Sequence, residues 1–141
     1  MSEPYRPNVR SQADLDAMWR HLMSPLGFGY RRIYVVFVPP DGRVVPRIAE
    51  VTDLSELPDP ELAGNLLTMC ADIIDQQLPT GTRVAFLYAR PGGPDFTTAD
   101  RRWGAALLEA ADAAFVPTWP VHLANDHRLR VLAPDDLAHP A

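Results

Sequence analysis

The sequence predicts an α/β domain with three layers, in which a mixed β-sheet of about five strands is flanked by helices. Runs of β-branched and aromatic residues alternate with segments whose apolar residues recur at helical spacing, and turn-forming residues separate them. A length of 141 residues with 47% hydrophobic residues can bury one core. We therefore expect a single domain over residues 11–137, a flexible N-terminal arm at 1–10 and a frayed tail at 138–141.

The first expected element is a helix that begins after Ser11, because Asp14 follows three residues later as in a capping box. The helix should end before Pro25 and Gly27. Its apolar residues form one stripe at helical spacing: Leu15, Met18, Trp19, Leu22 and Met23.

A β-hairpin is expected next. Residues 33–38 (IYVVFV) are typical of a buried strand, and residues 39–42 (PPDG) are a strong turn signal. A second strand should return over residues 43–51. Because Pro46 cannot donate a ladder hydrogen bond, this strand should lie at a sheet edge or be bulged there.

The remaining elements follow from cap and turn residues. Asp59 and Pro60 predict the start of a second helix, which should end near Leu78, and Thr97 followed by Asp100 predicts the start of a third. Strands are expected at 84–89, 119–123 and 129–132, with a turn at 125–127. This order joins strands through helices, which predicts a mixed sheet with helices on its faces.

Composition limits the possible functions. The net charge of −5 disfavours binding to nucleic acid. Cys70 is the single cysteine, which excludes an intramolecular disulfide and a zinc site built from several thiolates. No apolar run approaches the length of a membrane span, and residues 1–10 lack the apolar core of a signal peptide. We expect a cytoplasmic protein that does not contact membranes.

Several strings, taken in order, resemble the RadC family of the JAB/MPN superfamily. Residues 32–51 (RIYVVFVPPDGRVVPRIAEV) are similar to its opening hairpin, and residues 117–132 resemble its closing hairpin. Residues 88–100 (YARPGGPDFTTAD) are similar to its metal loop, His-x-His-Pro-Ser-Gly followed by Ser-x-x-Asp at a helix start. The resemblance covers residues 31–133 and implies a fold of the cytidine deaminase-like or JAB-like type.

The departures from that pattern imply a degenerate metal site. Tyr88 and Arg90 stand where the family has its two metal-binding histidines, and Gly92 replaces the loop serine. Pro91, Gly93 and Asp100 match the family's pattern. Glu50 falls near the family's general-base glutamate. The family's chemistry needs imidazoles to hold zinc and a glutamate to move protons. We expect no bound metal or cofactor and no catalytic residue.

Asp100 could be a surviving metal ligand, or an ordinary helix-start carboxylate three residues after the cap Thr97, which we favour. Separately, we expect Arg90, whose fixed positive charge stands where the cation would be, to pair with Asp100. A new metal site from Asp100, His122 and Glu50 is the less favoured alternative.

These considerations favour a non-catalytic RadC/JAB-like domain that acts as a scaffold or protein-binding module. Its partner would be another protein or a second copy, contacted through edge strands or through helix 11–23. The first alternative is a metal-dependent hydrolase or peptidase with a remodelled ligand set. The second is a sensor of an anionic small molecule, bound by Arg90 and the loop Pro91, Gly92 and Gly93, although that loop is more simply a stiff connection.

Overall fold

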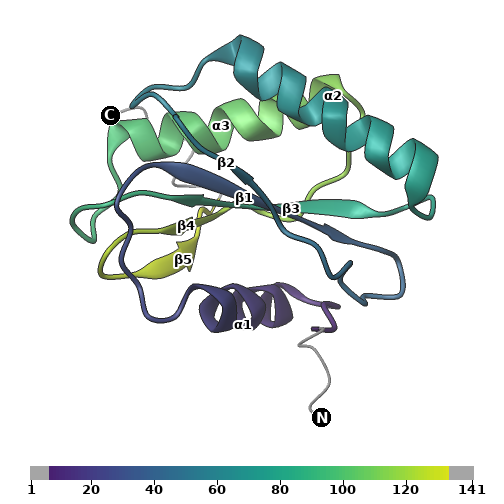
Figure 1. The fold of residues 1–141 in the computed structure, drawn as a ribbon, viewed down its shortest axis with the longest axis horizontal. Coiled ribbons are helices and arrows are strands. Elements are labelled where there is room, and N and C mark those ends of the chain that lie inside the picture. The colour runs from purple at the N-terminus through teal and green to yellow at the C-terminus, as the bar shows by residue number, and fades with distance from the viewer. Residues whose placement is uncertain (1–6, 134–141) are drawn as a thin grey trace.

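A five-stranded sheet lies between two helical layers in the computed structural model, which describes residues 7–133 (Figure 1). The helix α1 (Gln12–Met23) covers one face, and α2 (Pro60–Gln77) and α3 (Thr98–Ala113) cover the other. The predicted three-layer α/β class with a mixed sheet is therefore confirmed.

The strands run in the order β2-β1-β3-β4-β5. The strand β1 (Arg32–Val38) pairs antiparallel with both β2 (Ala49–Val51) and β3 (Arg83–Ala89), the central strand. β3 is parallel to β4 (His122–Ala124), which is antiparallel to β5 (Leu129–Val131). The parallel pair is joined through α3, as a parallel connection requires.

All three helices begin where their cap residues predict. The Ser11 hydroxyl accepts a hydrogen bond from the Asp14 backbone N–H at 3.1 Å, and the Asp59 carboxylate accepts one from the Glu61 N–H at 3.0 Å. The Thr97 side chain accepts from the Asp100 N–H at 3.1 Å. Each bond satisfies a backbone donor that the first helical turn leaves without a partner.

Prolines shorten two strands relative to the prediction. β2 spans only Ala49–Val51 and not 43–51, because Pro46 interrupts the ladder. The strand expected at 119–123 is found at His122–Ala124, and a separate bridge joins Thr118 to Val84. Three residue steps lead from Val84 to Leu87, whereas four lead from Thr118 to its counterpart His122. One extra residue is therefore accommodated where Pro120 lacks an N–H.

The expected flexible arm at residues 1–10 needs a correction at its C-terminal end. Val9 is buried, and its N–H donates to the Gly42 carbonyl at 2.7 Å. Gly42 has φ 84°, and a Cβ there would lie 2.9 Å from the Val9 carbonyl oxygen, so only glycine fits. Residues 1–6 and the tail 138–141 lie outside the described residues.

The sheet has a hydrophobic core on each face. On one face α1 buries its predicted stripe against the sheet, including Leu15, Met18 and Trp19. On the other face Trp103 and Leu107 of α3 pack with α2 and the sheet. The apolar stripe of α1 is thus buried within the fold. Among residues 7–133, no helix has the length and apolarity needed to cross a bilayer.

Phe115, just after α3, generates a stability prediction. Its side chain is 92% exposed and its backbone has φ 58°, a region that usually favours glycine at a helix C-terminus. We expect Phe115→Gly to raise the free energy of unfolding by about 0.5–1 kcal/mol, because it relieves this strain and removes almost no packing. Urea unfolding measures the change, and a loss of stability would contradict this account.

Candidate functional site

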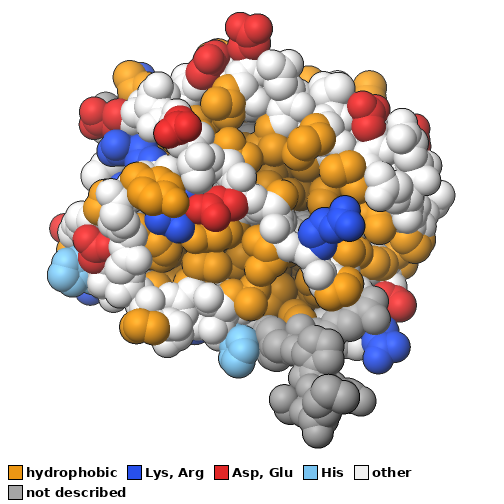
Figure 2. Space-filling model, viewed as in Figure 1, with side chains coloured by type: hydrophobic (Ala, Val, Ile, Leu, Met, Phe, Trp, Pro, Cys, Tyr) orange, Lys and Arg blue, Asp and Glu red, His pale blue; other side chains and the backbone are white. Residues whose placement is uncertain are grey.

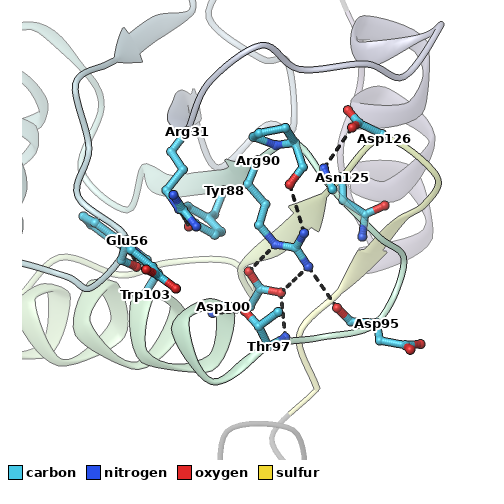
Figure 3. A network of polar contacts seen from close by, with 12 residues as sticks. Arg31, Glu56, Tyr88, Arg90, Asp95, Thr97, Asp100, Trp103, Asn125 and Asp126 are labelled. Carbon is cyan, nitrogen blue, oxygen red and sulfur yellow. Dashed lines mark hydrogen bonds and ion pairs between the residues drawn. The ribbon is translucent and has the colours of Figure 1, made fainter.

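The centre of the candidate site is a buried ion pair between Arg90 and Asp100 (Figure 3). Arg90 follows β3, and Asp100 lies in the first turn of α3. The guanidinium Nε is 2.7 Å from Asp100 Oδ1, and Nη2 is 2.8 Å from Oδ2. This two-pronged geometry is one that arginine forms and lysine cannot. The predicted pairing of these two residues is confirmed.

The remaining guanidinium donors of Arg90 bind the loop that follows it. Nη1 donates to the Pro91 carbonyl at 3.1 Å, and Nη2 also donates to the Asp95 carbonyl at 2.9 Å (Figure 3). The hydrogen bonds that Arg90 donates to Asp100 raise the pKa of Arg90 above its usual value, although burial opposes the effect. The loop is therefore folded around a permanent positive charge.

Asp100 also closes the capping box of α3. Its Oδ2 accepts the Thr97 backbone N–H at 2.9 Å, and Thr97 caps Asp100 in return. The interpretation of Asp100 as a helix-start carboxylate is therefore correct together with the pairing to Arg90. One buried carboxylate serves both the helix terminus and the arginine, and its side chain is 0% exposed.

Tyr88 lies beside this pair, and its side chain is fully buried. It stacks on Trp103 of α3 with ring centroids 5.6 Å apart, and its hydroxyl accepts from Arg31 Nε at 3.0 Å. Burial raises the pKa of Tyr88 to about 12, so the phenol stays protonated near neutral pH. Trp103 in turn donates its indole N–H to the carbonyls of Ser55 and Glu56 at 3.2 and 3.0 Å. The position that corresponds to the first metal-binding histidine of the RadC pattern is thus occupied by a tyrosine packed in the core.

The loop Pro91, Gly92 and Gly93 already binds an anionic side chain of the protein itself, that of Asp126. Asp126 accepts the Gly92 N–H at 2.8 Å and the Phe28 N–H at 2.9 Å. The bond from Gly92, followed by that from Phe28, lowers the pKa of Asp126. Gly92 has φ 113°, and a Cβ would meet Arg90 Nη1 at 3.0 Å, so the loop depends on this glycine. Pro91 and Gly93 belong to the same turn, and this arrangement gives no support to the binding of an external anion by the loop.

Glu50 and His122 do not join Asp100. Glu50 lies on the edge strand β2 and pairs with Arg32 at 3.1 Å. His122 faces α1, on the sheet face opposite α3, with Nε2 3.5 Å from Asp16 Oδ1. Within residues 7–133 no group of three His, Cys, Asp or Glu side chains is placed to hold a metal ion. The remodelled ligand set is therefore not formed.

His122 is part of a polar contact that fixes α1 to the sheet. Asp16 also pairs with Arg20 at 2.6 Å, and Arg20 donates to the Leu129 carbonyl of β5 at 2.6 Å. The imidazole is fully buried, and burial lowers the pKa of His122, although Asp16 opposes the effect. A neutral imidazole is the form that this environment favours.

The open edge of the sheet carries an apolar surface. Figure 2 shows hydrophobic side chains gathered across the middle of the face that presents β2. We call this the β2 surface and define it by Val45, Pro46, Ile48 and Val51. Ile48 is 43% exposed and borders a cavity of about 350 Å³ between α1 and the segment before β2.

A second polar cluster, around Arg32, was missed by the sequence reasoning. Arg32 Nη1 donates to the Tyr34 hydroxyl at 2.9 Å, and its guanidinium lies over the Tyr30 ring at 3.9 Å. The string GFGYRRIY at residues 27–34 contains the signal, because three aromatic residues flank two consecutive arginines.

Comparison with known protein families finds none that matches the chain, and comparison with curated proteins finds no match either.

The buried ion pair predicts a large stability loss on truncation. We expect Arg90→Met to lower the free energy of unfolding by about 3–5 kcal/mol, because it leaves the Asp100 carboxylate buried without a countercharge. Denaturant unfolding measures the loss. Arg102→Met, at an exposed arginine of α3, should change stability by no more than about 0.5 kcal/mol. Equal effects of the two variants would contradict this account.

His122 predicts a loss of stability in mild acid. Its pKa is lowered in the folded protein, so the unfolded chain takes up the proton first as the pH falls. This contribution is therefore present above about pH 6.5, the ordinary histidine pKa, and is lost as the pH falls from there towards the folded pKa. The urea midpoint should drop between about pH 7.5 and about pH 5.5, less so in His122→Gln than in wild type. His127→Gln, at an exposed histidine, should retain the wild-type dependence.

Proposed function

We propose that this chain is a non-catalytic, RadC/JAB-like module of the cytoplasm that binds another protein or a second copy through the β2 surface. The observation that carries the proposal is the open edge of the sheet. Within residues 7–133, β2 pairs only with β1, and hydrophobic side chains gather around it (Figure 2). Pro46 and Ile48 are exposed, and Val45 and Val51 are half-buried. Edge strands and exposed apolar patches are preferred sites of protein contact.

The non-catalytic part is supported by the chemistry of the Arg90 and Asp100 pair. Nε, Nη1 and Nη2 of Arg90 each donate to an acceptor in the protein, and the Asp100 side chain is fully buried. A group that acts on a substrate must reach it, and these groups are consumed by each other and by the loop. The pair also offers a physical reason why a chain of this family could keep its fold after losing the metal.

The β2 surface offers only a short strand for pairing with a partner strand. β2 presents three residues, and Pro46 prevents a longer ladder. Backbone pairing alone would therefore be weak, and most affinity should come from Ile48 and the apolar cavity beside it. This argument selects Ile48 as the residue to test.

Ile48→Asp should weaken association at least tenfold, because a desolvated carboxylate would be placed at the centre of the contact. Light scattering coupled to size exclusion detects self-association, and affinity capture with quantitative mass spectrometry detects other chains. Phe115→Gly is the matched control: it also removes an exposed hydrophobic side chain, but at the end of α3, and should leave association unchanged.

Either a dimer or a captured chain supports the proposal only where it depends on Ile48 and not on Phe115. The proposal is wrong if wild type remains monomeric at about 100 µM, a concentration that detects micromolar affinities, and captures no chain in an Ile48-dependent manner. Circular dichroism establishes that each variant is folded before the comparison.

A further inference from the structure

A cavity of about 430 Å³ lies on the α1 side of the sheet, between the end of α1, the segment that follows it, and strands β1 and β2. It is separate from the Arg90 and Asp100 pair, which lies towards α3. Its volume falls within the range of small-molecule sites, about 300–1,000 Å³. One wall is apolar and is formed by Leu22, Met23, Phe28 and Ile48.

The polar part of the lining, called the polar wall, consists of Arg32, Tyr34 and Glu50. The guanidinium lies over Tyr30 at 3.9 Å and near the rings of Tyr34 at 5.8 Å and Phe28 at 6.0 Å. Three aromatic rings therefore hold the cation in place. The Arg32 side chain is only 17% exposed, so it is positioned before any ligand arrives.

The polar wall carries both signs of charge side by side. Arg32 Nη1 is 3.1 Å from Glu50 Oε1, and it donates to the Tyr34 hydroxyl at 2.9 Å. Arg32 Nε is buried out of contact with solvent, so a ligand in the cavity would meet the terminal guanidinium nitrogens instead.

The charge pattern selects the class of ligand. A simple anion would be repelled by Glu50, and a simple cation would be repelled by Arg32. A small zwitterion satisfies both, because its carboxylate can face Arg32 while its ammonium faces Glu50. The Tyr34 hydroxyl accepts from Arg32 and still has its own proton to donate to a carboxylate oxygen.

We propose that this cavity binds a free α-amino acid with an apolar side chain. The carboxylate binds Arg32 and Tyr34, and the ammonium binds Glu50. The side chain packs against Leu22, Met23 and Ile48. This assignment gives Glu50 a role far from the degenerate metal site, and it does not depend on whether the β2 surface binds a protein.

The test uses ligands that differ by one charge. L-leucine, L-methionine and L-phenylalanine are titrated by calorimetry up to about 10 mM, a range that detects millimolar affinities. N-acetyl-L-leucine lacks the ammonium, and 3-methylbutylamine lacks the carboxylate. At least one of the three amino acids should bind, and both single-charge analogues should bind at least tenfold more weakly than L-leucine or not at all.

Variants separate the two charges. Glu50→Gln should weaken amino-acid binding at least tenfold, and Tyr34→Phe should weaken it to a smaller extent. Glu56→Gln, at an exposed glutamate away from the cavity, should bind as wild type does. The titrations are made on monomeric protein, since Ile48 borders both this cavity and the β2 surface.

Three results would overturn the proposal. The first is no binding of any of the three amino acids. The second is equal binding of leucine and either analogue, which would indicate a site for one charge only or a purely apolar cavity. The third is unchanged binding in Glu50→Gln. Because these readouts do not involve association, their failure is distinguishable from failure of the protein-binding proposal.

Discussion

The ion pair of Arg90 and Asp100 is the interaction on which this part of the fold depends. A guanidinium and a carboxylate removed from water are tolerated only when every strong donor and acceptor is satisfied. Here the carboxylate also completes the capping box of α3, and the guanidinium also anchors the loop after β3. The end of a strand, the connecting loop and the start of a helix are consequently fixed by two side chains. A bound metal ion commonly fixes neighbouring segments in the same way, through its charge and its directional bonds to ligands.

The two faces of the sheet carry different polar groups. The face towards α2 and α3 holds the ion pair, Tyr88 and Trp103, and its polar groups are directed at one another. The face towards α1 contains His122, the Arg32 cluster and the cavity beside it. A cavity of about 390 Å³ also lies between α2 and α3, so both sides of the sheet carry openings to solvent.

Most of the fold could be predicted from the sequence because its signals are local. Cap residues such as Ser11 and Thr97 mark helix starts through bonds to residues two or three positions away, and helical periodicity then sets the buried side. The strand ends were predicted less well. Pro46 was recognised as a breaker, but Pro120 was not, and its one-residue bulge depends on pairing with a distant strand.

The site was predictable only where the partners are close in sequence. Arg90 and Asp100 are ten residues apart and joined by a loop of recognisable type, so their pairing could be expected. His122 and Glu50 were grouped with them by chemistry, but side-chain alternation and strand order place them elsewhere. The cluster of Arg32 with Glu50 needs the antiparallel register of β1 and β2, which composition does not specify.

One carboxylate ties two distant loops together. Asp126 receives the N–H of Gly92, in the turn around Arg90, and the N–H of Phe28, on the wall of the Arg32 cavity. The two bonds use the two oxygens of one carboxylate, so a displacement of either loop changes a hydrogen bond to the same side chain. The turn around Arg90 and the cavity beside Arg32 are thus joined through one exposed aspartate.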